Sequence, residues 1–149
     1  MGGVIAMLVV DGTDLVLGRV ASRVAKRLLA GEEVSLVNAE KLVISGNPEY
    51  TYAKYLKRRG AHNKSNPEHS PHWPRRPDML VRRIVRGMLP WQEPRGRQAF
   101  KLLRVYIGVP GELSAEKAVK FDRMDKGKLF VKYVTIKGLC QHLGWQASS

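Results

Sequence analysis

Two short apolar runs separated by an amphipathic segment place the strongest limit on how this chain can fold. The runs are residues 7–10 and 34–37, and the segment between them spans residues 17–30. Apolar residues recur in that segment at the three- and four-residue spacing of one helix face, and Gly31 follows as a natural helix stop. A strand, a helix and a strand joined by short links form a βαβ unit. We therefore expect two parallel strands with a right-handed crossover.

Further strands and helices are expected along the rest of the chain. Residues 42–44 and 103–107 are strand candidates, and residues 50–59 and 95–102 are helix candidates. This alternation of strands and helices indicates the α/β class.

The most clearly marked helix is expected over residues 77–89. Pro77 suits a first helical position, Asp78 suits the positive end of the helix dipole, and Pro90 ends the helix. The apolar side consists of Leu80, Val81, Ile84, Val85 and Met88, and the basic side consists of Arg82, Arg83 and Arg86. One side is therefore predicted to pack on the protein while the other points three guanidinium groups outward. A membrane-surface helix would need bulky aromatics on an exposed apolar side, so core packing is favoured.

Positive charge is concentrated in the middle of the chain. The formal net charge of the 149 residues is +13. Residues 54–104 contain fourteen basic and three acidic side chains, which accounts for eleven of these thirteen charges. Charge of this size strains a compact fold by self-repulsion, and a polyanion would relieve it. Nucleic acid is the usual partner of such a region, and the arginine-rich composition favours it. The alternatives are binding to an anionic membrane surface, or a basic surface that is solvated and has no partner.

Residues 60–76 are expected to form a basic, irregular extension. They hold three of the eight prolines, three of the four histidines and few aliphatic residues. Such a stretch buries little apolar surface by itself, so we expect a partner to order it. Trp73 could stack on a base or anchor the extension to the core, and both interpretations stay open. Residues 7–59 and 77–149 then form the core of a single domain over residues 1–149.

The single cysteine and the N-terminal residues exclude several other arrangements. Cys140 can form no internal disulfide, which fits a reducing compartment. It lies on the apolar face of a helix expected near residues 136–143, where a buried hydrophobe is a better interpretation than a nucleophile. Residues 4–10 are too short to span a bilayer, and no charged leader precedes them. Residues 1–6 are interpreted as a short extension, with Met7 as an alternative start.

Motifs for catalysis or cofactor binding are incomplete. Gly12 and Gly18 lie between a strand and a helix, but their spacing fits neither a P-loop nor a dinucleotide fingerprint. Gly18 and Arg19, at a helix start, could instead receive an RNA phosphate. The histidines lack the second cysteine or carboxylate set that a metal site needs, and no catalytic triad or carboxylate pair is present. We therefore expect no catalytic residue, metal, cofactor or small-molecule substrate.

Four segments carry a resemblance to a known family: VDGTDLVLGRVASRVAKRLLAGE (10–32), VNAEKLVISGN (37–47), RRPDMLVRRIVRGMLP (75–90) and GRQAFKLLRVYIGVP (96–110). The most specific element is RGMLP followed by the basic GR-x-A helix. With these segments the chain resembles the large ribosomal subunit protein thirteen family, in its archaeal and eukaryotic form. The resemblance covers residues 7–110 well and the HLGW ending more loosely, whereas residues 62–76 differ. The short segment after Trp145 favours an archaeal source.

The resemblance implies a fold, a partner and a set of RNA contacts. The fold is a three-layer α/β/α sandwich around a four-stranded, mostly parallel sheet, and the partner is large-subunit ribosomal RNA. By position, the implied contacts are Gly18, Arg19, Ser45, Gly46, Asn47, Arg82, Arg83, Arg86, Arg95 and Arg97. The basic middle region adds Lys54, Lys57, Arg58, Arg59, Lys64, Trp73, Arg75, Arg76 and Lys101 as expected contacts.

The main hypothesis is a structural, RNA-binding constituent of the large ribosomal subunit, placed on the cytoplasmic ribosome with neighbouring ribosomal proteins as further partners. Double-helical RNA hides its base edges in a narrow groove, so recognition should be mostly of shape and backbone. A nucleotide-dependent enzyme on a Rossmann-like sheet is a second hypothesis, which micromolar mononucleotide binding would favour. A peripheral membrane protein is a third, which flotation with anionic vesicles in competition with RNA would test.

Overall fold

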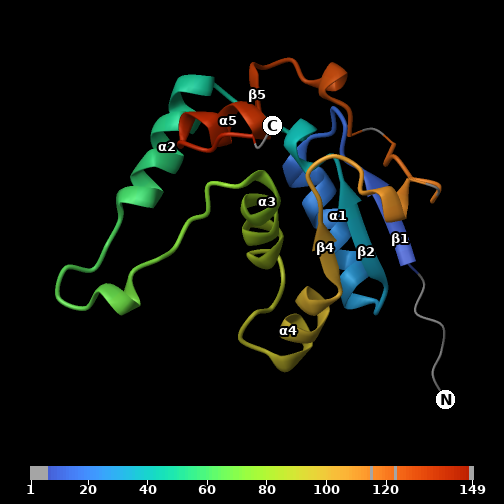
Figure 1. The fold of residues 1–149 in the computed structure, drawn as a ribbon, viewed down its shortest axis with the longest axis horizontal. Coiled ribbons are helices and arrows are strands. Elements are labelled where there is room, and N and C mark those ends of the chain that lie inside the picture. Colours follow the sequence, from blue (N-terminus) through green and yellow to red (C-terminus); the bar gives the residue numbers. More distant parts are fainter. Residues whose placement is uncertain (1–6, 115, 123, 148–149) are drawn as a thin grey trace.

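The described residues, which are 7–114, 116–122 and 124–147 of this computed structural model, form a mixture of strands and helices (Figure 1). The strands are β1 (Met7–Asp11), β2 (Glu33–Val37), β3 (Val43–Ser45), β4 (Leu103–Val105) and β5 (Tyr133–Thr135). The α-helices are α1 (Leu17–Leu29), α2 (Pro48–Gly60), α3 (Pro77–Arg86), α4 (Pro94–Lys101) and α5 (Ile136–His142). The short extension expected over residues 1–6 lies outside the described residues.

The N-terminal βαβ unit is present as predicted. β1 pairs in parallel with β2, with Val9 opposite Ser35, and α1 connects the two strands. The helix buries the residues that its periodicity predicts, namely Leu17, Val20, Ala21, Val24, Ala25 and Leu28. Gly31 follows with a φ of 92°, a left-handed conformation that glycine adopts without strain and that ends the helix.

The parallel sheet has three strands, in the order β1–β2–β4. The expected four-stranded sheet is not confirmed. Val119 occupies the free edge of β1 through a single parallel bridge, in which its N–H donates to the Val9 carbonyl at 2.8 Å. The pairing stops there because the chain then leaves the edge: Phe121 is buried, and the Met124 carbonyl accepts from the N–H of Val16 at 2.8 Å.

Helices cover one face of this sheet, and irregular chain covers the other. Val10, Val34 and Leu36 share a buried cluster with residues of α1, α3 and α4. On the opposite face Val9 and Val37 pack against Leu113, which lies in a single 3₁₀ turn (Gly111–Leu113) of the otherwise irregular segment after β4. The second helical layer of the expected sandwich is therefore not found in the part of the chain that the structure describes.

A second, two-stranded sheet lies near the carboxyl ends of the parallel strands. β3 pairs with β5 in antiparallel fashion, with Ile44 opposite Val134. Beside it α2 and α5 pack together (Figure 1). The rings of Tyr52 and His142 stack between these two helices, with 4.3 Å between their centroids. The Thr135 side chain caps the start of α5, where it accepts from the N–H of Gly138. The sequence pattern did not predict β5.

The segment between α2 and α3 is irregular, as expected for residues 60–76. It extends away from the body before the chain returns at Pro77, and its only regular part is a single 3₁₀ turn at Pro67–His69 (Figure 1). Most of its side chains are exposed.

The start of α4 lies very close to the turn that follows α3. A Cβ atom added at Gly96 would overlap the backbone carbonyl of Pro90, so only glycine fits there without movement of the chain. RGMLP and the GR-x-A helix, which form the most specific sequence element, thus meet at one backbone contact.

We expect Gly96→Ala to destabilise the fold by about 1–3 kcal/mol, because the added methyl group must displace either α4 or the Pro90 turn. Urea denaturation would measure the loss. Gly60→Ala is the matched control, since no atom lies within 4 Å of its added Cβ and alanine is the better helix former. Equal stability of Gly96→Ala and the parent would contradict the steric argument.

Candidate nucleic-acid interface

The side of α3 that faces away from the core presents three arginines. Leu80, Val81 and Val85 are fully buried, whereas Arg82, Arg83 and Arg86 are partly exposed. Met88, expected on the apolar side, is instead 42% exposed, because the helix ends at Arg86 before reaching it. We call these three arginines, together with Arg58 at the end of α2, the arginine surface.

Each guanidinium group of this surface lies over an aromatic ring. The distances from the guanidinium carbon to the ring centroid are 4.8 Å for Arg82 over Phe100, 5.0 Å for Arg83 over Trp73, 4.6 Å for Arg86 over Trp91 and 4.8 Å for Arg58 over Trp73. Stacking uses the flat face of a guanidinium group and leaves its N–H donors pointing along the edge, where they can bind a phosphate. The rings therefore hold the charges in fixed positions beside one another.

Trp73 connects the extension to the body. It packs against the main core cluster, and its ring meets that of Tyr55 edge to face at 6.0 Å. Its carbonyl accepts a hydrogen bond from Arg59. Of the two interpretations left open by the sequence, these contacts favour the anchor.

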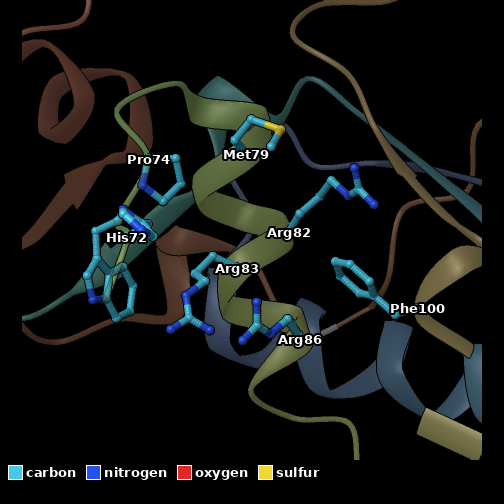
Figure 2. Close-up of a pocket in the computed structure, with 8 residues that line it drawn as sticks. His72, Pro74, Met79, Arg82, Arg83, Arg86 and Phe100 are labelled. Carbon is cyan, nitrogen blue, oxygen red and sulfur yellow. The ribbon is translucent and has the colours of Figure 1, made fainter. Parts of the chain in front are cut away.

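An open hollow of about 360 Å³ lies against the outer side of α3. Figure 2 shows Met79 and the arginines projecting from α3, with His72 and Pro74 of the extension on one side and Phe100 of α4 on the other. The hollow thus combines apolar walls with a basic rim.

Like charges crowd one another at this surface. Burial lowers the pKa of Arg83, and the neighbouring charges of Arg86 and Arg58 lower it further. Burial also lowers the pKa of Arg59, with a contribution from Arg75. Among the described residues no carboxylate forms an ion pair with any arginine of the surface. An anionic partner would supply the missing counter-charge.

Other expected contacts flank the arginine surface. Lys54 and Lys57 line a second hollow, of about 510 Å³, along α2. Arg76 is paired with Asp78 at 3.3 Å, and Lys64 is exposed in the extension. On α4, three basic residues are exposed: Arg95 lies 3.9 Å from Glu93, Arg97 donates to the Trp91 carbonyl at 3.0 Å, and Lys101 lies at the helix end.

The two remaining groups of expected contacts line neither hollow. Gly18 and Arg19 are exposed at the start of α1. Ser45, Gly46 and Asn47 form the turn into α2, where the Asn47 side chain accepts from the N–H of Glu49 at 3.1 Å and so caps that helix. Asn47 therefore has a structural role whether or not RNA binds it.

Sequence reasoning missed the aromatic partners of the arginines. Tyr55, Trp91 and Phe100 were not named as site residues, although each contacts an arginine of the surface. The available signal was the interleaving of arginine with aromatic residues over residues 55–100. That pattern is typical of surfaces that bind nucleic acid.

Catalytic and metal chemistry gains no support from the described part of the chain. Cys140 is fully buried, and burial raises the pKa of its thiol to about 12, with a smaller contribution from Asp78. The described residues contain no group of three or more metal-binding side chains. None of their helices is both long enough and apolar enough to cross a membrane.

The described residues thus form an α/β domain with an arginine surface that lacks counter-charges, which are the features of a nucleic-acid-binding protein. The sequence profile of the family described as "Ribosomal protein L13" matches residues 5–112. The chain belongs to this family, whose members are structural ribosomal proteins rather than enzymes.

Relatives support the same assignment over nearly the whole chain. The protein named "Large ribosomal subunit protein uL13" in Methanococcus maripaludis is 45% identical over 139 residues, which cover 93% of this chain and 98% of the relative. In Methanosphaera stadtmanae the protein of the same name is 49% identical over 116 residues, which cover 77% of this chain and 82% of the relative. In Aeropyrum pernix it is 42% identical over 146 residues, which cover 97% of this chain and 94% of the relative. All three are archaeal, which matches the form of the family that the sequence resembles.

The buried thiol gives a direct test of the packing beneath the interface. We expect Cys140 in the folded protein to react with iodoacetamide at pH 8 about a thousandfold more slowly than in the denatured protein, because the thiolate is the reactive form and its population falls as the pKa rises. Mass spectrometry over time would measure both rates. Labelling of the native protein at the rate of an unfolded peptide would show that α5 does not pack as described.

Proposed function

We propose that this chain is a structural constituent of the large ribosomal subunit that binds and stabilises folded large-subunit ribosomal RNA during assembly and translation. Its partners are that RNA and neighbouring large-subunit ribosomal proteins, and its place is the cytoplasmic ribosome. The observation that carries the proposal is the arginine surface, in which each guanidinium group is held over a ring and lacks a carboxylate partner among the described residues.

The arginine surface suits a folded RNA better than an unstructured polyanion. Its charges come from α2 and α3, which the core holds at fixed positions, so their spacing is set before the partner arrives. A rigid pattern of donors matches phosphates whose positions are also fixed, as in folded RNA. In this proposal the extension and α4 add charge on either side, through Lys64, Arg75, Arg76, Arg95, Arg97 and Lys101. Gly18, Arg19 and residues 45–47 are proposed as separate, smaller contacts.

Binding should depend steeply on salt. If about eight phosphates are neutralised, log K should fall by about six units per unit of log salt, since each contact releases condensed counterions. Titration of a structured ribosomal RNA fragment at several salt concentrations would give the slope. A slope near zero would contradict an electrostatic interface.

Replacing Arg82, Arg83 and Arg86 together by glutamine should reduce that slope by about three and weaken RNA binding at least tenfold. The fold should persist, because Leu80 and Val81 on the buried side are unchanged. RNA titration and circular dichroism would measure the two properties.

The matched control replaces Arg23, Lys117 and Lys120 by glutamine, which removes the same charge from exposed residues outside the arginine surface. Equal loss of affinity in both triple variants would mean that total charge, rather than this surface, drives binding. Unfolding of the α3 variant alone would mean that the arginines support the fold.

A further inference from the structure

The hollow beside α3 has a composition that phosphate binding alone does not explain. Met79, Pro74 and Phe100 give it apolar walls, and guanidinium groups stand around them (Figure 2). A phosphate would use the guanidinium groups and gain nothing from an apolar wall. The hollow therefore suits a ligand that is flat and apolar in one part and anionic in another.

The apolar group and the basic groups that α3 contributes to the hollow lie on one side of that helix. Met79, Arg82, Arg83 and Arg86 follow one another at spacings of three, one and three residues, so they share one side of the helix. Met79 lies near the N-terminal end of this side and Arg86 lies at its C-terminal end. A ligand lying along the helix would meet an apolar side chain first and then three cations.

The size of the hollow and one unsatisfied donor narrow the choice of ligand further. Its volume of about 360 Å³ is at the lower end of the range for small-molecule sites, which suits a single base rather than a helix of RNA. The Nε atom of Arg82 is enclosed by protein and has no hydrogen-bond partner among the described residues. An acceptor on a ligand would satisfy this donor if the guanidinium group turned outward from Phe100.

We propose that this hollow receives one unpaired, extrahelical nucleotide of the RNA, with its base against Met79 and Phe100 and its phosphate on Arg83 and Arg86. This inference rests on the proposed function. Bases inside a duplex are stacked and cannot enter a hollow, whereas a nucleotide that is already unpaired does so at little cost. The duplex on either side of that nucleotide would lie along the arginine surface.

The test compares three short RNA hairpins that differ at one position, using the full chain. One has an unpaired 2-aminopurine nucleotide, one has an abasic residue at the same place, and one is fully paired. We expect the hairpin with the unpaired base to bind about tenfold more tightly than the abasic one, which is the usual effect of one stacked base. We also expect the fluorescence of the 2-aminopurine to change on binding, as its ring enters the hollow.

Two variants with the same charge change separate the hollow from general electrostatics. Met79→Glu places a carboxylate one turn from Arg82 and Arg83 inside the hollow, whereas Met88→Glu places it on the same segment outside. Both methionines are more than 40% exposed, so both variants should fold. Both should bind all hairpins more weakly, but only Met79→Glu should lose the tenfold preference for the unpaired base.

A further variant, Phe100→Leu, keeps an apolar wall but removes the ring beneath Arg82, and it should reduce the fluorescence change. Equal affinity of the parent for the unpaired and abasic hairpins would overturn the proposal while leaving the proposed function intact. Failure to bind any hairpin would overturn the proposed function itself. Displacement of the RNA by micromolar adenosine monophosphate would show that the hollow serves a free nucleotide, which also overturns the proposal.

Discussion

The packing of α3 into the core places the arginines of this helix on its outer side. Burial of Leu80, Val81 and Val85 stabilises the helix by about 1.5–3 kcal/mol for each side chain. Repulsion between two charges 4 Å apart ranges from about 1 kcal/mol in bulk water to about 4 kcal/mol near a protein surface, and salt reduces it. The three buried side chains together contribute about 4.5–9 kcal/mol, which is more. Apolar burial therefore dominates, and the arginines must share the outer side although they repel one another.

The aromatic rings around α3 make this crowding tolerable. A guanidinium group over a ring gains about 0.5–1 kcal/mol at an exposed site, which offsets part of the repulsion from its neighbours. Trp73 has a second effect. Arg58 of α2 and Arg83 of α3 both lie over its ring, so Trp73 links these two helices to the base of the extension. The surface is thus assembled from three segments that are separate in sequence.

The parts of the fold that were predictable from sequence are those that local periodicity determines. α1 buries the residues that its spacing indicates, and α3 divides into an apolar and a basic side as its sequence predicts. β5 escaped prediction because three residues, of which only Val134 is buried, leave no pattern to recognise. The single bridge at Val119 and the stacking of Arg86 on Trp91 depend on tertiary packing, which local periodicity does not contain.

The pairing of β3 with β5 has a consequence for the order in which the protein can form. β3 follows closely on the N-terminal βαβ unit, but its partner strand lies near the other end of the chain, with Ser45 opposite Tyr133. During synthesis the βαβ unit can therefore collapse early, whereas β3 has no strand to pair with until nearly all residues have left the peptide tunnel. α2 packs against β5 and α5, so the helix that carries Arg58 acquires its final position last. A nascent chain would then complete its arginine surface, by bringing Arg58 beside the arginines of α3, only in the closing stage of its own translation.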